Sequence, residues 1–196
     1  MIKKIFHFKF SIFNSVKQAG FTVLESIIAI FVLSLSISGA FSAVRQSLNQ
    51  SILSKEEVKA FYLAQEAVEI IRNKRDNNHL EKIVNSSSNS WLYGIAENGD
   101  PIVNICDFGD VCRVDSIPIP PSLTSCGDEW GDCATLNQNP TTFLYSYGLY
   151  PPSKFKREIT FESINADEVA VIVRITWTKG MTTKEFKIKT HLFNRI

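Results

Sequence analysis

Residues 20–25, Gly-Phe-Thr-Val-Leu-Glu, join a basic leader to a long apolar run. The leader carries four lysines and no acidic residue, and the run 26–44 carries no charge at all. Glu25 is the only charged residue between Lys17 and Arg45. The uncharged run is close to the ~20 residues that a membrane-spanning helix needs. A carboxylate at one end of such a helix is costly in hydrocarbon, so we expect it to have a function and a partner.

Gly20 lies before the apolar run, whereas a secretory signal places its small-residue cleavage site after the apolar stretch. Cleavage after Gly20 would remove the lysines and leave the apolar helix on the product. This pattern resembles the type IV prepilin signal, a glycine followed by Phe-Thr-x-x-Glu and an apolar helix. That family covers type IV pilins, minor pilins, the pseudopilins of type II secretion, and competence pilins.

The resemblance implies a role for three residues of the motif. A membrane-embedded prepilin peptidase would cut between Gly20 and Phe21 and would methylate the new N-terminus at Phe21. Glu25 would be the glutamate that the family uses in assembly. A plain N-terminal anchor with an incidental glutamate is the alternative interpretation.

Length and charge set the class of protein. A chain of 196 residues suits one globular domain plus an anchor. Without the leader's four lysines, 17 of the 21 basic residues remain against 20 acidic residues, a formal charge of about −3. This balance gives no electrostatic basis for nucleic-acid binding. The lysine-rich N-terminus is expected to stay cytoplasmic while the rest of the chain is exported.

A long helix is predicted from residue 21 to about residue 76, because this stretch has no proline and only one glycine, Gly39. Asn77 and Asn78 are its expected end. The second half is amphipathic, with one set of residues expected to face a sheet: Val44, Leu48, Ile52, Leu63, Ala64, Ala67 and Ile71. A second set is expected on the other faces: Glu56, Glu57, Lys59, Glu66, Glu69 and Arg72.

Strand periodicity is clearest in the last third of the chain. Apolar residues alternate from Val169 to Trp177 and again from Phe186 to Leu192, with a turn expected at Lys179-Gly180. A strand at about 156–164 is expected before them. Residues 79–155 have weak periodicity, and 91–93 and 143–145 are candidate short strands within them.

The predicted fold class is therefore α+β. A membrane-spanning helix would pack on a C-terminal antiparallel meander, as in the pilin fold, with a disulfide-containing loop insertion. The expected organisation is a cleaved leader at 1–20, a transmembrane assembly helix at 21–45 and a globular head at 46–196. The segment 79–155 would be an irregular, cysteine-containing insertion in the head.

The four cysteines of the chain are Cys106, Cys112, Cys126 and Cys133. Their spacings are not the C-x2-C pairs of zinc ribbons. Outside the cytosol disulfides persist, and four cysteines allow three connectivities. We favour local pairing of Cys106 with Cys112 and of Cys126 with Cys133, because each bond would close a short loop. The other connectivities remain open at this point.

Catalytic chemistry has little basis in the mature sequence. Its only histidines are His79 and His191, and neither lies in a nucleophile motif. There is no phosphate-binding glycine loop. Five acidic residues lie close to the cysteines in the sequence: Asp107, Asp110, Asp128, Glu129 and Asp132. Carboxylate oxygens are ligands that suit Ca²⁺. We nevertheless expect these side chains to be solvated and to bind no metal. We therefore expect no enzyme activity, no cofactor and no metal.

The function predicted from these features is that of a structural subunit, a minor pilin of a type IV pilus or a related filament. Its partners would be a prepilin peptidase, other pilin subunits and the assembly machinery, with residues 21–45 in the membrane. The mature head would be periplasmic or lie in an extracellular filament. The alternatives are a pseudopilin of a type II secretion or DNA-uptake system and a membrane-anchored periplasmic binding protein.

Overall fold

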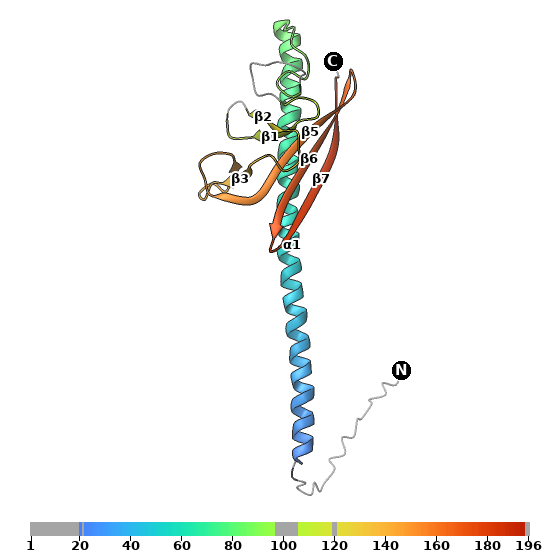
Figure 1. The fold of residues 1–196 in the computed structure, drawn as a ribbon, viewed down its shortest axis with the longest axis vertical. Helices are drawn as coiled ribbons and strands as arrows, with labels where there is room; N and C mark the ends of the chain where they lie inside the picture. The colour runs from blue at the N-terminus through green and yellow to red at the C-terminus, as the bar shows by residue number, and fades with distance from the viewer. Residues whose placement is uncertain (1–19, 21, 97–105, 119–120, 195–196) are drawn as a thin grey trace, which may run out of the picture. The chain divides into compact units, whose positions relative to one another are not determined.

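A computed structural model describes residues 20, 22–96, 106–118 and 121–194 (Figure 1). The chain divides into two compact units, Met1–Ser51 and Ile52–Ile196. One helix, α1 (Val23–Asn85), contributes to both units. The helix and the antiparallel sheet that follows make the fold class α+β, as predicted.

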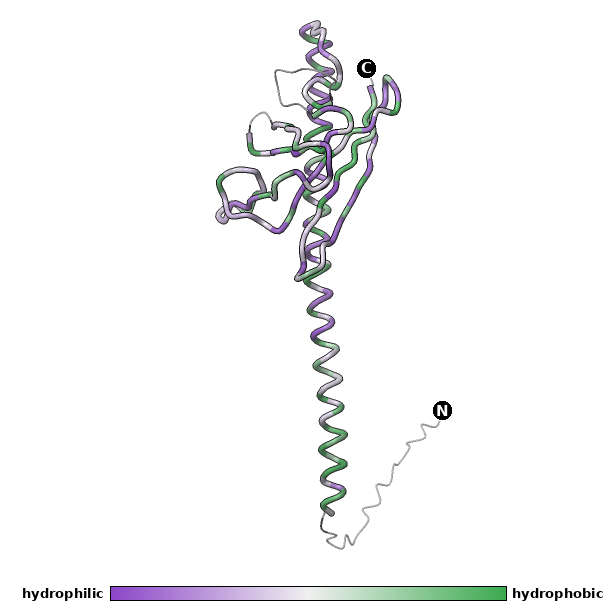
Figure 2. The backbone as a smooth tube through the Cα atoms, viewed as in Figure 1, coloured by the Kyte–Doolittle hydropathy of each residue, from purple (hydrophilic) through white to green (hydrophobic). Residues whose placement is uncertain are grey.

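In the first unit, α1 is apolar and uncovered by the rest of the described chain. Every helical residue from Val23 to Ser51 is exposed. Figure 2 shows this part of the helix mostly in the colours of hydrophobic residues. The helix runs through Gly39 without interruption, and a methyl group placed on that glycine would contact nothing.

In the second unit, α1 buries one stripe of residues against the sheet. The stripe repeats at intervals of three and four residues, as one face of a helix must: Glu56, Ala60, Leu63, Ala64, Ala67, Val68, Ile71 and Asn78. Four of the residues expected to face the sheet are in it. Val44, Leu48 and Ile52 are exposed, however, and Glu56 is buried, so the prediction was wrong at these four positions.

The C-terminal meander is confirmed. Its strands are β5 (Pro152–Asn165), β6 (Glu168–Lys179) and β7 (Thr182–Phe193), paired antiparallel in that order. The register places Ile159 opposite Val173 and Val173 opposite Ile188. Figure 1 shows these strands alongside the upper part of α1, where their apolar side chains join the helix stripe in one core.

Four further strands extend the sheet from the other edge of β5. They are β1 (Val111–Asp115), β2 (Ser122–Gly127), β3 (Thr135–Gln138) and β4 (Tyr145–Ser146). The order along this side is β2-β1-β5-β3-β4. The segment predicted to be irregular therefore holds two hairpins. Trp91–Tyr93 is a turn rather than a strand, and of residues 143–145 only Tyr145 is in a strand.

The helix ends at Asn85, beyond the end predicted at Asn77 and Asn78. Asn78 continues the helix because its buried amide has partners outside it, donating to the carbonyls of Trp91 at 3.0 Å and Tyr93 at 2.9 Å. The helix stops where Ser86 takes a φ of 52°, a left-handed conformation that often follows a helix C-terminus.

Candidate functional site

The residues of the 20–25 motif lie at the start of α1. Gly20 is exposed, Phe21 lies outside the described residues, and Thr22 immediately precedes the helix. The hydroxyl of Thr22 accepts a hydrogen bond from the backbone N–H of Glu25 at 3.3 Å. Thr22 is therefore the N-cap and Glu25 the third helical residue, the spacing of a capping box.

This local role of Glu25 was not part of the sequence interpretation. The sequence signal for it is the Thr-x-x-Glu spacing itself, which is typical of helix starts. A carboxylate in the first turn also faces the positive end of the helix dipole. Glu25 is exposed in the isolated chain, so its carboxylate is also free to meet another molecule. The presence of a glutamate at this position therefore has two separate explanations, capping of the helix and pairing with a partner.

Serine side chains of the apolar half donate hydrogen bonds to carbonyls of their own helix. The Ser34 hydroxyl donates to the carbonyl of Ile30 at 2.8 Å, and the Ser36 hydroxyl donates to that of Val32 at 2.9 Å. Hydroxyls bonded in this way need no water. In the part of the chain that the structure describes, α1 is the one helix long and apolar enough to cross a membrane. This supports a single-pass membrane protein.

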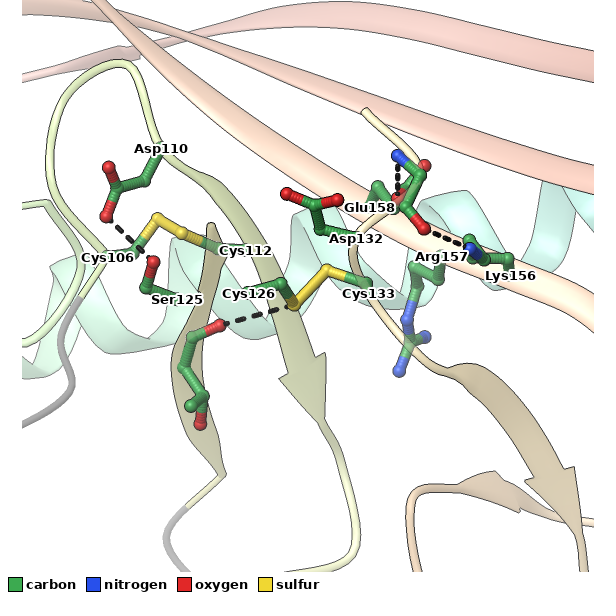
Figure 3. The surroundings of a disulfide bond; sticks show 12 residues. Cys106, Asp110, Cys112, Ser125, Cys126, Asp132, Cys133, Lys156, Arg157 and Glu158 are labelled. Atoms are coloured by element: carbon green, nitrogen blue, oxygen red, sulfur yellow. Dashed lines mark hydrogen bonds between the residues drawn. A yellow bond between two sulfur atoms is a disulfide. The ribbon is translucent and has the colours of Figure 1, made fainter. Parts of the chain in front are cut away.

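The two disulfides join Cys106 to Cys112 and Cys126 to Cys133, the local pairing favoured above (Figure 3). The Cα atoms lie 5.8 Å apart in the first bond and 5.0 Å apart in the second. Cys106 and Cys112 are fully buried in the core, whereas Cys126 is only half-buried on the edge strand β2.

The loop closed by the second disulfide covers a buried ion pair. Glu158, on β5, is fully buried and accepts hydrogen bonds from the Gly131 N–H at 2.7 Å and from Arg174 Nη2 at 2.6 Å. The Arg174 guanidinium also lies over the ring of Trp130, 4.2 Å from its centre. Trp130 thus packs on a cation at the surface.

The acidic residues near the cysteines accept hydrogen bonds from neighbouring residues of the same region. The Asp110 carboxylate accepts from the Ser125 hydroxyl at 2.8 Å (Figure 3). The Asp132 carboxylate accepts from the Glu129 N–H at 3.3 Å. Among the residues described, no three His, Cys, Asp or Glu side chains are grouped so as to hold a metal ion. The histidines lie apart, with His79 stacked on Trp91 and His191 hydrogen-bonded to Glu168.

Two buried charged groups fasten α1 to the sheet, and neither was foreseen. Glu56 accepts hydrogen bonds from Trp177 Nε1 at 3.1 Å and from Lys154. The hydrogen bond and charge of Lys154 hold the pKa of Glu56 below its ordinary value, against burial, which raises it. Arg157, on β5, donates to Glu66 at 2.6 Å and to the carbonyl of Leu63 at 3.2 Å.

Comparisons of the chain with models of protein families, with curated proteins and with solved structures find no match.

Proposed function

We propose that this chain is a structural subunit, a minor pilin, of a type IV pilus or a related filament. The observation that carries the proposal is the position of Glu25, five residues after Gly20 and at the first turn of an exposed apolar helix. A monomer that leaves this much apolar surface uncovered needs a lipid or protein environment for it. The α+β head, with its helix packed on a meander, is of the kind expected for such a subunit.

The proposed cycle begins in the membrane. The lysines of the leader keep the N-terminus cytoplasmic while the head is exported. A prepilin peptidase cuts after Gly20, and Phe21 then carries a new amine, which is cationic even when methylated. The Glu25 carboxylate of one subunit pairs with the Phe21 amine of its neighbour. Such a pair fixes the axial register of apolar helices, which would otherwise slide past one another.

The capping role of Glu25 makes a different prediction from the pairing role, and two substitutions separate them. Glutamine serves in a capping box as well as glutamate does, but it carries no charge. Valine in place of Thr22 removes the cap hydroxyl and leaves the carboxylate in place. Pairing therefore predicts that Glu25→Gln fails in assembly and that Thr22→Val succeeds.

Incorporation into sheared filaments, measured by immunoblot against the amount of subunit in the membrane, tests the proposal. We expect Glu25→Gln and Glu25→Ala to be processed and membrane-inserted at wild-type level but nearly absent from filaments. Loss of one partner of a desolvated pair costs about 3–5 kcal/mol, so incorporation should fall by more than tenfold. If Glu25→Gln entered filaments normally and Thr22→Val did not, the pairing role would be wrong and Glu25 would act only in capping the helix.

A further inference from the structure

The two ends of the β5–β6–β7 meander carry opposite charges. Around the β5–β6 turn, residues 162–168 include three acidic residues and no basic one. Around the β6–β7 turn, residues 176–184 include two lysines and no acidic residue. The start of β5, residues 152–156, lies at this second end because Phe155 is in register with Trp177, and it adds two more lysines. We call the end formed by the β6–β7 turn and the start of β5 the basic end.

Strand β7 runs alongside α1 in the same direction. Phe186 contacts Phe61, with ring centres 6.0 Å apart. Further along β7, Thr190 accepts a hydrogen bond from Arg72 Nη2 at 3.3 Å, so later residues of the strand meet later residues of the helix. The β6–β7 turn, which precedes β7, therefore points toward earlier residues of α1 (Figure 1). Because the second unit begins at Ile52, the basic end is the end at which α1 enters that unit from its apolar half.

Lysines and one methionine are exposed together at the basic end. Trp177 Nε1 donates to Glu56 at 3.1 Å, and Lys184 lies opposite Trp177 in the register of β6 and β7. Lys184 is thus at the level of Lys55, the helical neighbour of Glu56. Met181, at the tip of the turn, is fully exposed. Lysines beside an exposed apolar side chain are typical of surfaces that bind at a membrane interface.

The positive charge of the basic end is not neutralised within the chain. Three of the lysines in this region are exposed and form no ion pair with any residue that the structure describes: Lys55, Lys59 and Lys184. Glu56 is already paired with Lys154, which leaves Glu57 as the one other acidic residue between positions 52 and 60. At the opposite end of the meander, two of the three acidic residues are bonded to side chains of β7. The unpaired lysines are therefore available to an anionic partner.

With the apolar half of α1 in a bilayer, lipid headgroups lie within reach of these lysines. The charge-free run ends just before Arg45, and Lys55 follows ten residues later, about 15 Å along the helix. Headgroups occupy roughly the first 5–8 Å outside the hydrocarbon. At physiological salt, charges act over about a further 8 Å. The β6–β7 turn points toward the bilayer from this level, so Met181 lies closer still.

We propose that the basic end of the head binds the surface of the bilayer in which α1 is anchored. Lys55, Lys59 and Lys184 bind the phosphates of anionic phospholipids, and Met181 enters the headgroup layer. Lipid is the partner because every anchored copy of the chain has headgroups at this end, whatever its protein neighbours. The acidic end of the meander points away from that surface, so the separation of charge favours one orientation of the head. This binding requires the membrane anchor alone and is independent of leader cleavage and of Glu25.

Quenching by labelled lipids tests this contact on the full-length chain. Met181→Cys and Ile164→Cys each receive a fluorophore on the new cysteine, and the chains are reconstituted into vesicles that contain a phospholipid with a nitroxide on its headgroup. Ile164 is the matched control position, because it is exposed beside the β5–β6 turn at the acidic end. Each lysine at an anionic surface shifts such a contact equilibrium by about fivefold. We therefore expect strong quenching of the Met181 probe in vesicles of equal parts phosphatidylcholine and phosphatidylglycerol, and weak quenching in phosphatidylcholine alone. The Ile164 probe should be quenched weakly in both.

Substitution of the exposed lysines separates lipid binding from folding. In the Met181→Cys chain, Lys55→Gln/Lys59→Gln/Lys184→Gln should lower the quenching in anionic vesicles to its level in phosphatidylcholine alone. About 1 M salt should do the same to the chain with its lysines intact, because the screening length is then about 3 Å. The melting temperature of the triple variant should match that of the parent, since exposed, unpaired lysines contribute little to stability.

A control variant removes the same number of lysines from other positions of the second unit: Lys82→Gln/Lys187→Gln/Lys189→Gln. It should leave the quenching of the Met181 probe unchanged. Equal loss of quenching in both triple variants would overturn the proposal, because net charge and not the basic end would then govern the contact. Equal quenching of the Met181 probe with and without phosphatidylglycerol, or equal quenching of the Ile164 and Met181 probes, would also overturn it. If the fluorescence instead followed the protein-to-lipid ratio, the basic end would bind another copy of the chain and the proposal would be wrong.

Discussion

Arg157 of β5 and Glu66 of α1 form an ion pair at 2.6 Å, in which the arginine side chain is fully buried and the glutamate is partly exposed. The same guanidinium donates to the carbonyls of Leu63 in the helix and of Val114 in β1, at 3.2 and 2.7 Å. One cation therefore links the helix, the long strand β5 and the first hairpin. Tyr147 adds to this centre by donating its hydroxyl to the Arg157 carbonyl at 3.1 Å, and burial raises the pKa of Tyr147 to about 12.

Removing Glu66 should destabilise the head more than the exposure of its own side chain suggests. In Glu66→Ala the Arg157 charge stays buried without its anion, and such a change costs about 3–5 kcal/mol; partial exposure of Glu66 favours the low end. Urea unfolding of the chain in micelles, followed by tryptophan fluorescence, measures the difference.

Two further variants check the origin of that loss. Glu69→Ala removes an exposed helix pair, Glu69–Arg72, and should cost less than about 1 kcal/mol. The double variant Glu66→Ala/Arg157→Met should recover part of the stability, because it no longer buries an unpaired charge. If the double variant were less stable than Glu66→Ala, the Arg157 guanidinium would stabilise the head through its hydrogen bonds to backbone carbonyls and not through its ion pair with Glu66.

The stability of the head should depend on pH through Glu56. Its folded pKa lies below the ordinary value of 4.5, so the unfolded chain binds the proton more tightly. The ionised carboxylate therefore stabilises the fold above the unfolded pKa, and that stabilisation is lost as the pH falls through the lower, folded value. Glu56→Gln should cost about 1.5–3 kcal/mol at pH 7, as loss of hydrogen bonds to a charged group does.

Melting temperature measured from pH 7 down to the acid limit tests this dependence. The difference in melting temperature between wild type and Glu56→Gln should become smaller once the pH drops below 4.5. Glu57→Gln, at the exposed neighbouring position, should follow the wild-type curve throughout. A gap of constant size at every pH would mean that packing, and not ionisation, explains the contribution of Glu56.

The two disulfides should differ in their rate of reduction. A thiolate must reach a sulfur atom to open the bond, and Cys126 is half-buried whereas Cys106 and Cys112 are fully buried. Limited treatment with dithiothreitol, followed by alkylation and peptide mapping, should label Cys126 and Cys133 at least about tenfold faster than the other pair. In urea the rates should converge. Equal labelling in the folded chain, or faster labelling of Cys106 and Cys112, would contradict this ranking.

Periodicity in the sequence was sufficient to predict the regular parts of the fold. Alternation from Val169 to Trp177 and from Phe186 to Leu192 corresponds to β6 and β7, because one face of each strand packs on the helix. The apolar run after Glu25 likewise corresponds to the exposed half of α1. These elements were predictable since burial follows the side-chain period of a single strand or helix.

Charged residues inside the core could not be predicted in this way. Glu56, Arg157 and Glu158 are buried because partners on distant segments neutralise them, and a rule that places charges outside cannot anticipate such pairs. The helix also passes Asn78, since that amide finds carbonyl partners 13 and 15 residues later. The strands β1 to β4 are only two to six residues long, so their sequences are too short to show a clear alternation.

The central claim, that this chain is a processed pilin-like subunit, rests on the bond after Gly20. Intact-mass and N-terminal peptide spectra of the protein purified from its native membrane or filament fraction test it most directly. We predict a mature chain that begins at Phe21 with a methylated amine, and a leader that persists in Gly20→Leu. A mature chain that begins at any other residue, or a wild-type protein that keeps residues 1–20, would contradict the account.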